Sequence, residues 1–372
     1  MGNSVLTRVS PAERLALKSP LRVVAIGGGT GLSTLLSGLK KHARGQDSRS
    51  TEKPLVEITA VVTVSDDGGS SGRLRRDFDI LPPGDIRNCM TALSEDEALL
   101  SHLFRYRFAS GRGLKGHSFG NLFLTAMHQI TGDFAHAVRL SSEILAIRGR
   151  IFPATSANVS LEATLADGAV VRGETKISKS RREIREIRLH PGNCKPLPET
   201  LEALSRADLI TLGPGSLYTS VIPNMLVQDI PEAIENSPAL KVYFVNLMWQ
   251  PGETINFTAS QHVQAIQRHA KRKLIDCVVL NTSPIPVALR RRYARVKVKP
   301  VENDFDQLSE LGVKVVTADL LGDPDGGIQK VRHNPEALAD VVVDLASRSR
   351  VHQVRRETLS RTQALIQRKR SR

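Results

Sequence analysis

Six segments of the sequence combine glycine with hydroxyl, amide or carboxylate side chains, the groups that bind phosphates and sugars. The first is Gly-Gly-Gly-Thr-Gly at residues 27–31, which follows an apolar run and precedes a helical sequence. Glycines let a backbone approach a phosphate, and a helix N-terminus offers free N–H groups. The spacing is neither GxGxxG, because Leu32 replaces the third glycine, nor a P-loop. The loop predicts an anion or nucleotide site, with a tight strand-to-helix turn as the alternative. Its candidate ligand-binding residues are Gly28, Gly29, Thr30 and Gly31.

The second segment, at residues 65–73, reads SDDGGSSGR and also follows an apolar run. Two adjacent carboxylates at the C-terminal end of a strand lie where open α/β sheets bind ligands, and they suit a ribose hydroxyl or a magnesium ion. The alternative is a solvated acidic turn in which an aspartate caps the next helix. The candidates are Asp66, Asp67, Gly69, Ser70 and Ser71, with Asp66 and Asp67 also candidate ligands of Mg²⁺.

Two shorter motifs follow in the same half of the chain. LPPGDIRN at residues 81–88 predicts a rigid turn, with Asp85 as the N-cap of a helix and with Arg87 and Asn88 within reach of a ligand. GLKGHSFGN at residues 113–121 opens another helix, where His117 and Asn121 are four residues apart and therefore share one face. For both motifs, capping and packing explain the residues about as well as binding does.

The last two segments lie in the second half of the chain. They are LGPGSLYTS at residues 212–220 and NLMWQPGET at residues 246–254. A second glycine-rich loop at a strand end is typical of the opposite wall of a crevice where the strand order reverses. Neutral amides suit a base or a sugar, and Trp249 either stacks on a ligand or packs at the rim. We expect Ser260 to cap the helix that follows. The candidates are Gly213, Gly215, Ser216, Asn246 and Gln250.

Short apolar runs alternate with amphipathic segments throughout the chain, which predicts an α/β fold with a mainly parallel sheet flanked by helices. The expected strands are residues 21–26, 57–64, 208–212, 241–246, 276–281 and 313–317. Two helices are expected to face the core, one through Phe119, Leu122, Phe123, Ala126 and Ile130, the other through Leu338, Val341, Val342 and Leu345.

The remaining segments define the expected domain organisation, in which residues 21–346 form one domain. Residues 151–191 alternate apolar and polar side chains around an Asp-Gly turn, which predicts a small β-rich insertion. Residues 1–20 are interpreted as a flexible leader, without the apolar stretch of a secretory signal. Residues 347–372 are polar and basic, and we expect them to be weakly helical and partly disordered.

The formal net charge is +14, which favours nucleic acid, an anionic membrane or phosphorylated ligands as partners. The excess lies in residues 347–372 (+8), 290–299 (+6) and 172–188 (+4), so the glycine-rich body is slightly acidic. Aromatic residues make up only 4% of the chain and do not alternate with basic ones, so no specific nucleic-acid partner is expected. No apolar run approaches the roughly 20 residues of a membrane span. Three isolated cysteines fit a reducing cytoplasm better than a disulfide framework.

These motifs together resemble the CofD/YvcK family, since GGGTGLSTLLSGLK, TVSDDGGSSGRLR, LPPGDIRNC, GHSFGNLFL, LGPGSLYTSVIPN and NLMWQPGET occur in its order between residues 21 and 345. The resemblance implies a Rossmann-like fold and a cytoplasmic bacterial protein. The chain resembles the YvcK branch, the gluconeogenesis factors, more than the CofD transferases. The second loop of the transferases diverges after the paired aspartates. The YvcK branch implies binding of UDP-N-acetylglucosamine and a role in cell shape during growth on gluconeogenic carbon sources. The CofD branch implies magnesium-dependent transfer of a phospholactyl group to a deazaflavin.

The resemblance also implies roles for particular residues. It assigns Asp66 and Asp67 as carboxylates facing the ligand or metal, and it places Phe257 and Arg332 near the sugar nucleotide. Relatives generally have tyrosine at the position of Phe257, so this chain keeps the stacking ring and lacks one hydroxyl. Three functions remain as hypotheses: a sugar-nucleotide-binding regulator without turnover, a magnesium-dependent transferase, and, as the least supported, a nucleic-acid-binding protein. The sequence leaves open a homo-oligomer and a protein partner.

Overall fold

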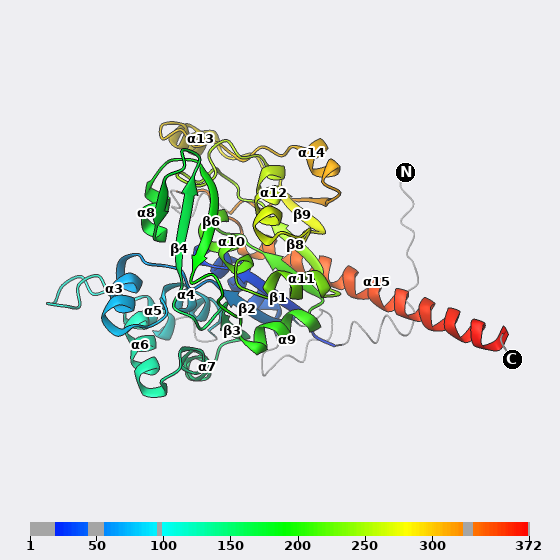
Figure 1. Cartoon of the computed structure of the whole chain (residues 1–372), viewed down its shortest axis with the longest axis horizontal. Coiled ribbons are helices and arrows are strands. Elements are labelled where there is room, and N and C mark those ends of the chain that lie inside the picture. Colours follow the sequence, from blue (N-terminus) through cyan, green and yellow to red (C-terminus); the bar gives the residue numbers. More distant parts are fainter. Residues whose placement is uncertain (1–18, 44–55, 95–98, 323–329, 371–372) are drawn as a thin grey trace.

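A parallel sheet of seven strands forms the centre of the molecule (Figure 1). The computed structural model describes residues 19–43, 56–94, 99–322 and 330–370. The strand order is β10-β9-β8-β7-β1-β2-β3, and all neighbours pair in parallel. The strands are β1 (Leu21–Gly27), β2 (Val56–Val62), β3 (Arg150–Pro153), β7 (Leu209–Leu212), β8 (Leu240–Phe244), β9 (Cys277–Asn281) and β10 (Lys314–Ala318). The predicted α/β class and all six predicted strands are confirmed.

The strand order reverses at β1, whose two neighbours are β2 and β7. Val23 of β1 lies opposite Ile58 of β2 on one side and opposite Leu209 of β7 on the other. Strands β2 and β3 follow β1 in the sequence and lie on one side of it. After the insertion, β7 lies on the other side of β1, and β8, β9 and β10 extend the sheet in that direction. The loops that follow β1, β2, β7 and β8 therefore leave the sheet at one edge, and they contain the glycine-rich motifs.

Right-handed crossovers that run in opposite directions place helices on both faces of such a sheet. On one face, α2 (Gly29–Leu39) packs against α4 (Gly84–Leu93) and α15 (Pro335–Arg370). The other elements in this half are η1 (Lys40–His42), α3 (Gly69–Phe78), α5 (Leu99–Arg105), α6 (Phe119–Thr131) and α7 (Phe134–Ile144). The second half contributes α9 (Pro198–Arg206), η2 (Leu217–Val221), α10 (Ile222–Met225), α11 (Ile230–Asn236), α12 (Ala259–Ala270), α13 (Val287–Ala294) and α14 (Phe305–Glu310).

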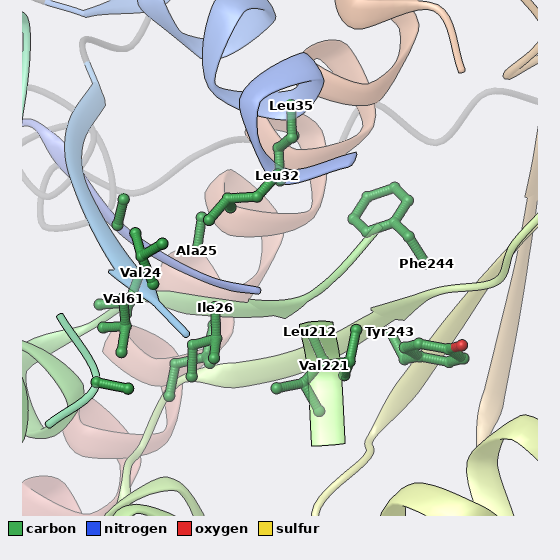
Figure 2. Close-up of a cluster of buried hydrophobic side chains, with 14 of the residues drawn as sticks. Val24, Ala25, Ile26, Leu32, Leu35, Val61, Leu212, Val221, Tyr243 and Phe244 are labelled. Carbon is green, nitrogen blue, oxygen red and sulfur yellow. The ribbon is translucent and has the colours of Figure 1, made fainter. Parts of the chain in front are cut away.

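The core lies between the sheet and these helices, and β1 is buried from both sides. Figure 2 shows Ala25 near Leu32 and Leu35 of α2, while Ile26 points toward Leu212 and Val221. Successive residues of a strand point to opposite faces, so a strand covered on both faces is apolar throughout. Each fully buried Ile or Leu stabilises the fold by roughly 1.5–3 kcal/mol relative to an exposed position, so β1 is a rigid base for the loop that follows it.

The predicted β-rich insertion is present, with a later start than expected. It contains β4 (Ser160–Leu165), β5 (Val170–Arg172), α8 (Glu174–Lys179) and β6 (Ile184–His190), and its antiparallel strands are ordered β5-β4-β6. Ile151 was predicted to belong to it, yet it lies in β3 of the main sheet opposite Ala60. Strand β3 is only four residues long, and the sequence pattern could not separate it from the alternating run that follows.

Helix α6 buries a different face from the one predicted. Its buried residues are Gly120, Asn121, Leu124 and Thr125. Ile130, predicted to face the core, is 78% exposed. Phe119 and Phe123 do pack against the core as predicted, beside the ring of Phe104, with centroids 6.0 and 5.1 Å away. Small and polar residues of α6 are buried because this helix packs against α3 and α4. Asn121 of α6 donates a hydrogen bond to Ser70 of α3.

Two predicted helix caps are also corrected. Asp85 is the second residue of α4, and Pro83 is its N-cap. Thr258, not Ser260, caps α12, and it forms a capping box with Gln261. In both cases a neighbouring residue has the extended or turn backbone that precedes the helix, which leaves the predicted cap inside the first turn.

The segment predicted to be a weakly helical, partly disordered tail belongs to a long helix. Helix α15 continues to Arg370, and its C-terminal part extends away from the body (Figure 1). No glycine or proline follows Pro335, so nothing in the sequence breaks the helix. Its predicted core residues Leu338, Val342 and Leu345 are buried. Arg350, beyond the predicted domain boundary, is 6% exposed and pairs with the buried Asp208.

Three further expectations concern the ends of the chain, the membrane and the cysteines. The predicted leader, residues 1–20, lies outside the described residues except for Ser19 and Pro20. Among the described residues, no helix is long and apolar enough to cross a membrane. Cys89, Cys194 and Cys277 are free and buried.

Candidate functional site

A cavity of about 380 Å³ opens at the edge of the sheet where the strand order reverses. The loops after β1, β7 and β8 form its walls, and residues 331–333 close one side. The predicted site residues that line it are Gly28, Thr30, Gly31, Gly215, Ser216, Asn246, Gln250 and Arg332. The two glycine-rich loops lie far apart in the sequence, around Gly31 and Gly215, and form opposite walls of one crevice as predicted.

The two glycine loops approach each other too closely for side chains. A Cβ at Gly31 would lie 2.3 Å from the carbonyl oxygen of Pro214, which is backbone and cannot move aside. A Cβ at Gly28 would lie 2.8 Å from a carboxylate oxygen of Asp85. Gly29, which begins α2, has φ +61°, a conformation that favours glycine. These glycines expose the first turn of α2 to the cavity, where N–H groups have no partner within the helix.

The amides of the opposite wall hold that wall in place. Gln250 donates from Nε2 to Ser216 Oγ at 2.7 Å and accepts the N–H of Leu217 at 3.1 Å. Asn246 donates from Nδ2 to Oε1 of the same glutamine at 3.0 Å. Trp249 lines the cavity and donates from Nε1 to the carbonyl of Phe257 at 3.0 Å. The wall is therefore formed before any ligand binds, with the indole and amide groups fixed at its surface.

Glu253 is a buried carboxylate of this cavity that the sequence analysis did not select. It accepts the N–H of Tyr218 at 3.0 Å and the hydroxyl of Thr219 at 3.1 Å. Burial raises its pKa to about 7, and these hydrogen bonds oppose the shift. The carboxyl is therefore close to half protonated at neutral pH, so it can both donate and accept within the site. Its only signal in the sequence is its place in the PGET motif, among neutral polar residues.

Phe257 lines a second cavity, of about 290 Å³, rather than the first. Glu253 lines both cavities, so they meet at this residue. The ring of Phe257 packs edge-on against Tyr218 and His262, with centroids 6.2 and 5.7 Å away. Arg181 and Arg182 of the insertion line the same cavity. The position that the resemblance placed near a sugar nucleotide therefore borders the junction between the insertion and the main domain.

The paired aspartates point in different directions. Asp66 accepts the N–H of Gly68 at 2.8 Å, and burial raises its pKa. Asp67 accepts both the N–H and the hydroxyl of Thr175, at 2.9 and 2.7 Å. Thr175 belongs to α8 of the insertion, so Asp67 joins the insertion to the second glycine loop. Neither aspartate lines the cavity.

Asp85 and Glu174 add two carboxylates beside Asp66. Burial raises the pKa of Asp85 to about 6 and that of Glu174 to about 9, and the charge of Asp66 adds to both shifts. The N–H of Gly29 opposes the shift of Asp85. Asp85 therefore accepts a hydrogen bond from the first glycine loop. Glu174, at the start of α8 in the insertion, lies near Asp66 and Asp85. Both residues were missed as site residues, since one was assigned as a cap and the other lies in a segment read only as a β-insertion.

The magnesium site predicted at Asp66 and Asp67 stays a prediction, and one oxygen of Asp67 already accepts two hydrogen bonds from Thr175. In the part of the chain described, no three His, Cys, Asp or Glu side chains converge on a point that could hold a metal ion. Mg²⁺ is usually held by one or two carboxylates together with waters and substrate phosphates, so a site at these aspartates would depend on a bound ligand. We therefore derive no step through a metal.

The predicted pair His117 and Asn121 meets at Ser70 rather than at the cavity. His117 Nδ1 lies 2.9 Å from Ser70 Oγ, and Asn121 donates to the same oxygen at 3.1 Å. Burial and the charge of Arg73 lower the pKa of His117, which favours the neutral ring. All three residues are at most 5% exposed. This cluster joins α3 to α6.

Several other predicted residues lie outside the cavity lining. Arg87 donates to Asn88 Oδ1 at 2.6 Å, and burial lowers the pKa of its guanidinium. Gly213 forms the turn after β7 with φ +71°. Gly69 and Ser71 belong to the first turn of α3. These residues build the loops around the crevice without reaching it.

Two lining residues near the C-terminal end of the sheet also escaped prediction. His333 follows Arg332 in the cavity wall, and burial lowers its pKa to about 4. Tyr293 lines the cavity from the basic helix α13 and accepts the N–H of Val331 at its hydroxyl, 3.1 Å away. A basic segment with one tyrosine carried no pattern that pointed to a site, so only the fold reveals these contacts.

Comparison with known proteins agrees with this fold and these motifs. The family model described as 2-phospho-L-lactate transferase CofD matches residues 23–321. The gluconeogenesis factor of Bacillus subtilis is 45% identical over 87% of this chain and 98% of its own length. That of Halalkalibacterium halodurans is 46% identical over 87% of this chain and 95% of its own length. A crystal structure of a Bacillus halodurans protein superimposes with a TM-score of 0.81 at 45% identity, covering 87% of this chain and all of that one. This chain belongs to the CofD family and is similar over most of its length to the gluconeogenesis factors within it.

Proposed function

We propose that this chain is a cytoplasmic regulator that binds a sugar nucleotide of the UDP-N-acetylglucosamine type and acts without turning it over. In this proposal it supports gluconeogenic growth and normal cell shape. The observation that carries the proposal is the crevice between the two glycine loops, at the edge where open α/β sheets bind nucleotides. Similarity to proteins named gluconeogenesis factors supports the biological role.

The chemistry of the crevice fits each part of such a ligand. The first turn of α2, with Thr30 and Gly31 in the lining, provides N–H and hydroxyl donors for phosphate oxygens. Asn246 and Trp249 present an amide and a flat indole ring suited to a base. Phe257, on the second cavity beyond Glu253, offers an apolar ring to the sugar. The ligand would then extend from the first cavity toward the second.

The absence of turnover is proposed because, among the residues that the structure describes, no nucleophile with a paired base lines the crevice. The hydroxyl with a histidine partner, that of Ser70, is 5% exposed and belongs to the cluster between α3 and α6. In this proposal, ligand binding changes the conformation of the insertion and so signals the ligand concentration. Asp67 joins the insertion to the second glycine loop.

Titration calorimetry with UDP-N-acetylglucosamine at physiological salt tests the proposal. Gln250→Ala should weaken binding at least 10-fold, because it releases both Ser216 and Leu217 from the wall. Gln264→Ala, an exposed change on α12, is the matched control and should leave the affinity unchanged. Ligand at 100 times its Kd should raise the free energy of unfolding by about 2.7 kcal/mol. No heat and no stabilisation with the intact chain would refute the proposal.

The family match also favours a second candidate, transfer of a phospholactyl group to a deazaflavin. An assay with the guanosine-activated donor, the deazaflavin and added magnesium distinguishes the two functions. Product formation would establish the transferase, and unchanged substrates together with UDP-sugar binding would support the regulator.

A further inference from the structure

A second groove lies away from the crevice, between strand β6 of the insertion and the end of helix α12. Its cavity measures about 550 Å³ and shares no lining residue with the cavity of about 380 Å³ at the sheet edge. Arg185 and Arg188 come from β6, whereas Arg268 and Lys271 come from the last turn of α12 and the residue after it. The groove therefore has a basic wall on each side.

Three of these four cations have no carboxylate partner. Arg188 is paired with Glu186 through two hydrogen bonds of 2.9 and 3.2 Å. Arg185, Arg268 and Lys271 are exposed, and none forms an ion pair with any residue that the structure describes. Arg268 lies beside the neutral hydroxyl of Tyr218. The four cations outnumber Glu186, the carboxylate in the described lining, which also lies near Lys271, so the hollow keeps a net positive charge that attracts an anion.

The two walls of the groove are held together by a buried histidine. His269 Nδ1 donates to the carbonyl of Ala265 at 2.7 Å, and Nε2 accepts the N–H of Ile187 at 3.1 Å. The bond that Nε2 accepts requires a neutral ring, and burial and the charge of Arg268 lower the pKa of His269. Because β6 is an edge strand, this bond fixes it to α12. The groove is consequently preformed, which reduces the entropy lost on binding.

We propose that this groove binds a small phosphorylated metabolite carrying at least two negative charges, at a site separate from the crevice. Its volume lies in the range of small-molecule sites, about 300–1,000 Å³. Its cationic walls match phosphate oxygens, since arginine provides paired N–H donors. Leu226 and Leu189 in the lining provide an apolar surface for the organic part. The only aromatic ring in the lining is the buried His269, so bases of a nucleic acid have no stacking platform there.

The test uses calorimetry of the full chain at 150 mM salt, with pyrophosphate and glucose 6-phosphate as probes and glucose as the uncharged comparison. The triple variant R185E/R268E/K271E should lose at least 10-fold in affinity for pyrophosphate. The matched control R291E/R295E/K297E makes the same charge change at exposed positions in and just after α13. It should lose less than 2-fold. Equal losses in both variants, or no binding by the intact chain, would overturn the proposal.

Two further measurements keep the result specific to the groove. R185E alone changes the β6 wall without touching Tyr218, and it should still weaken pyrophosphate binding several-fold if the triple variant is unstable. Saturating UDP-N-acetylglucosamine should leave pyrophosphate binding unchanged. Competition between the two would place the anion in the crevice and contradict a separate site, whereas failure of the UDP-sugar to bind would refute only the proposed function.

Discussion

Glu253 should make the stability of this protein depend on pH in a direction opposite to that of most carboxylates. Its carboxyl is 7% exposed and lies at the junction of the two cavities. Burial raises its pKa from 4.5 to about 7, despite hydrogen bonds from Tyr218 and Thr219. The native state therefore binds this proton more tightly than the unfolded chain does. The contribution of Glu253 to the free energy of unfolding is full below pH 4.5 and is lost as the pH rises through 7.

The size of this effect follows from the two pKa values. Between pH 5.5 and pH 8, a group with a pKa of 4.5 unfolded and about 7 folded lowers the free energy of unfolding by about 2 kcal/mol. Glu253→Gln removes the titration and keeps an oxygen that can accept the N–H of Tyr218. The variant should therefore lose about 2 kcal/mol less than the intact chain over the same pH range.

Urea denaturation at pH 5.5 and pH 8 measures this difference, with Glu310→Gln as the control. Glu310 ends α14 at an exposed position and forms no ion pair with the described residues. Its variant should show the same pH dependence as the intact chain. If Glu253→Gln and the intact chain lose equal stability between the two pH values, Glu253 does not retain a proton on folding and the reasoning is wrong.

Three other substitutions test the supports of the site. Arg350→Ala should lower the free energy of unfolding by about 1.5–3 kcal/mol, because it removes charge-assisted hydrogen bonds from the buried Asp208, which keeps its contacts with Arg22. The exposed Arg348→Ala should cost less than about 1 kcal/mol, and urea denaturation measures both. Asp67→Ala should release Thr175, so limited proteolysis should cut the insertion faster with the main domain intact. Gly31→Ala should separate the two glycine loops, because its Cβ would meet backbone at 2.3 Å. Calorimetry should show UDP-sugar binding at least 10-fold weaker, and an unchanged affinity would contradict the close approach.

The sequence was most informative where one periodicity dominated. Strands covered on both faces are continuously apolar, so β1 and β7 could be located within one residue of their observed bounds. Because parallel strands end at one edge, the loops at Gly28 and Gly215 could be assigned to opposite walls of one crevice. Strand β3 is the exception, since four residues next to an alternating run carry no separate signal.

The direction of a side chain was less predictable than its position in the chain. Asp66 and Asp67 are adjacent, yet one contacts its own loop and the other contacts Thr175, 108 residues away. That partner lies in an insertion whose placement follows from tertiary packing alone. His117 and Asn121 share a face as predicted, and the face turns toward Ser70 because α6 packs on α3.

The charges around the crevice restrict how it can hold a phosphorylated ligand. Glu253 lines the cavity, and Arg332 is the one arginine or lysine in its lining. A nucleotide diphosphate at this place would therefore depend mainly on the N–H groups of the first turn of α2 and on hydroxyls. Protonation of Glu253 would remove a negative charge near the phosphates, so the affinity for a UDP-sugar should rise as the pH falls through 7. Of the basic segments that dominate the net charge, residues 172–188 place Arg181 and Arg182 in the lining of the second cavity, which Glu253 also lines.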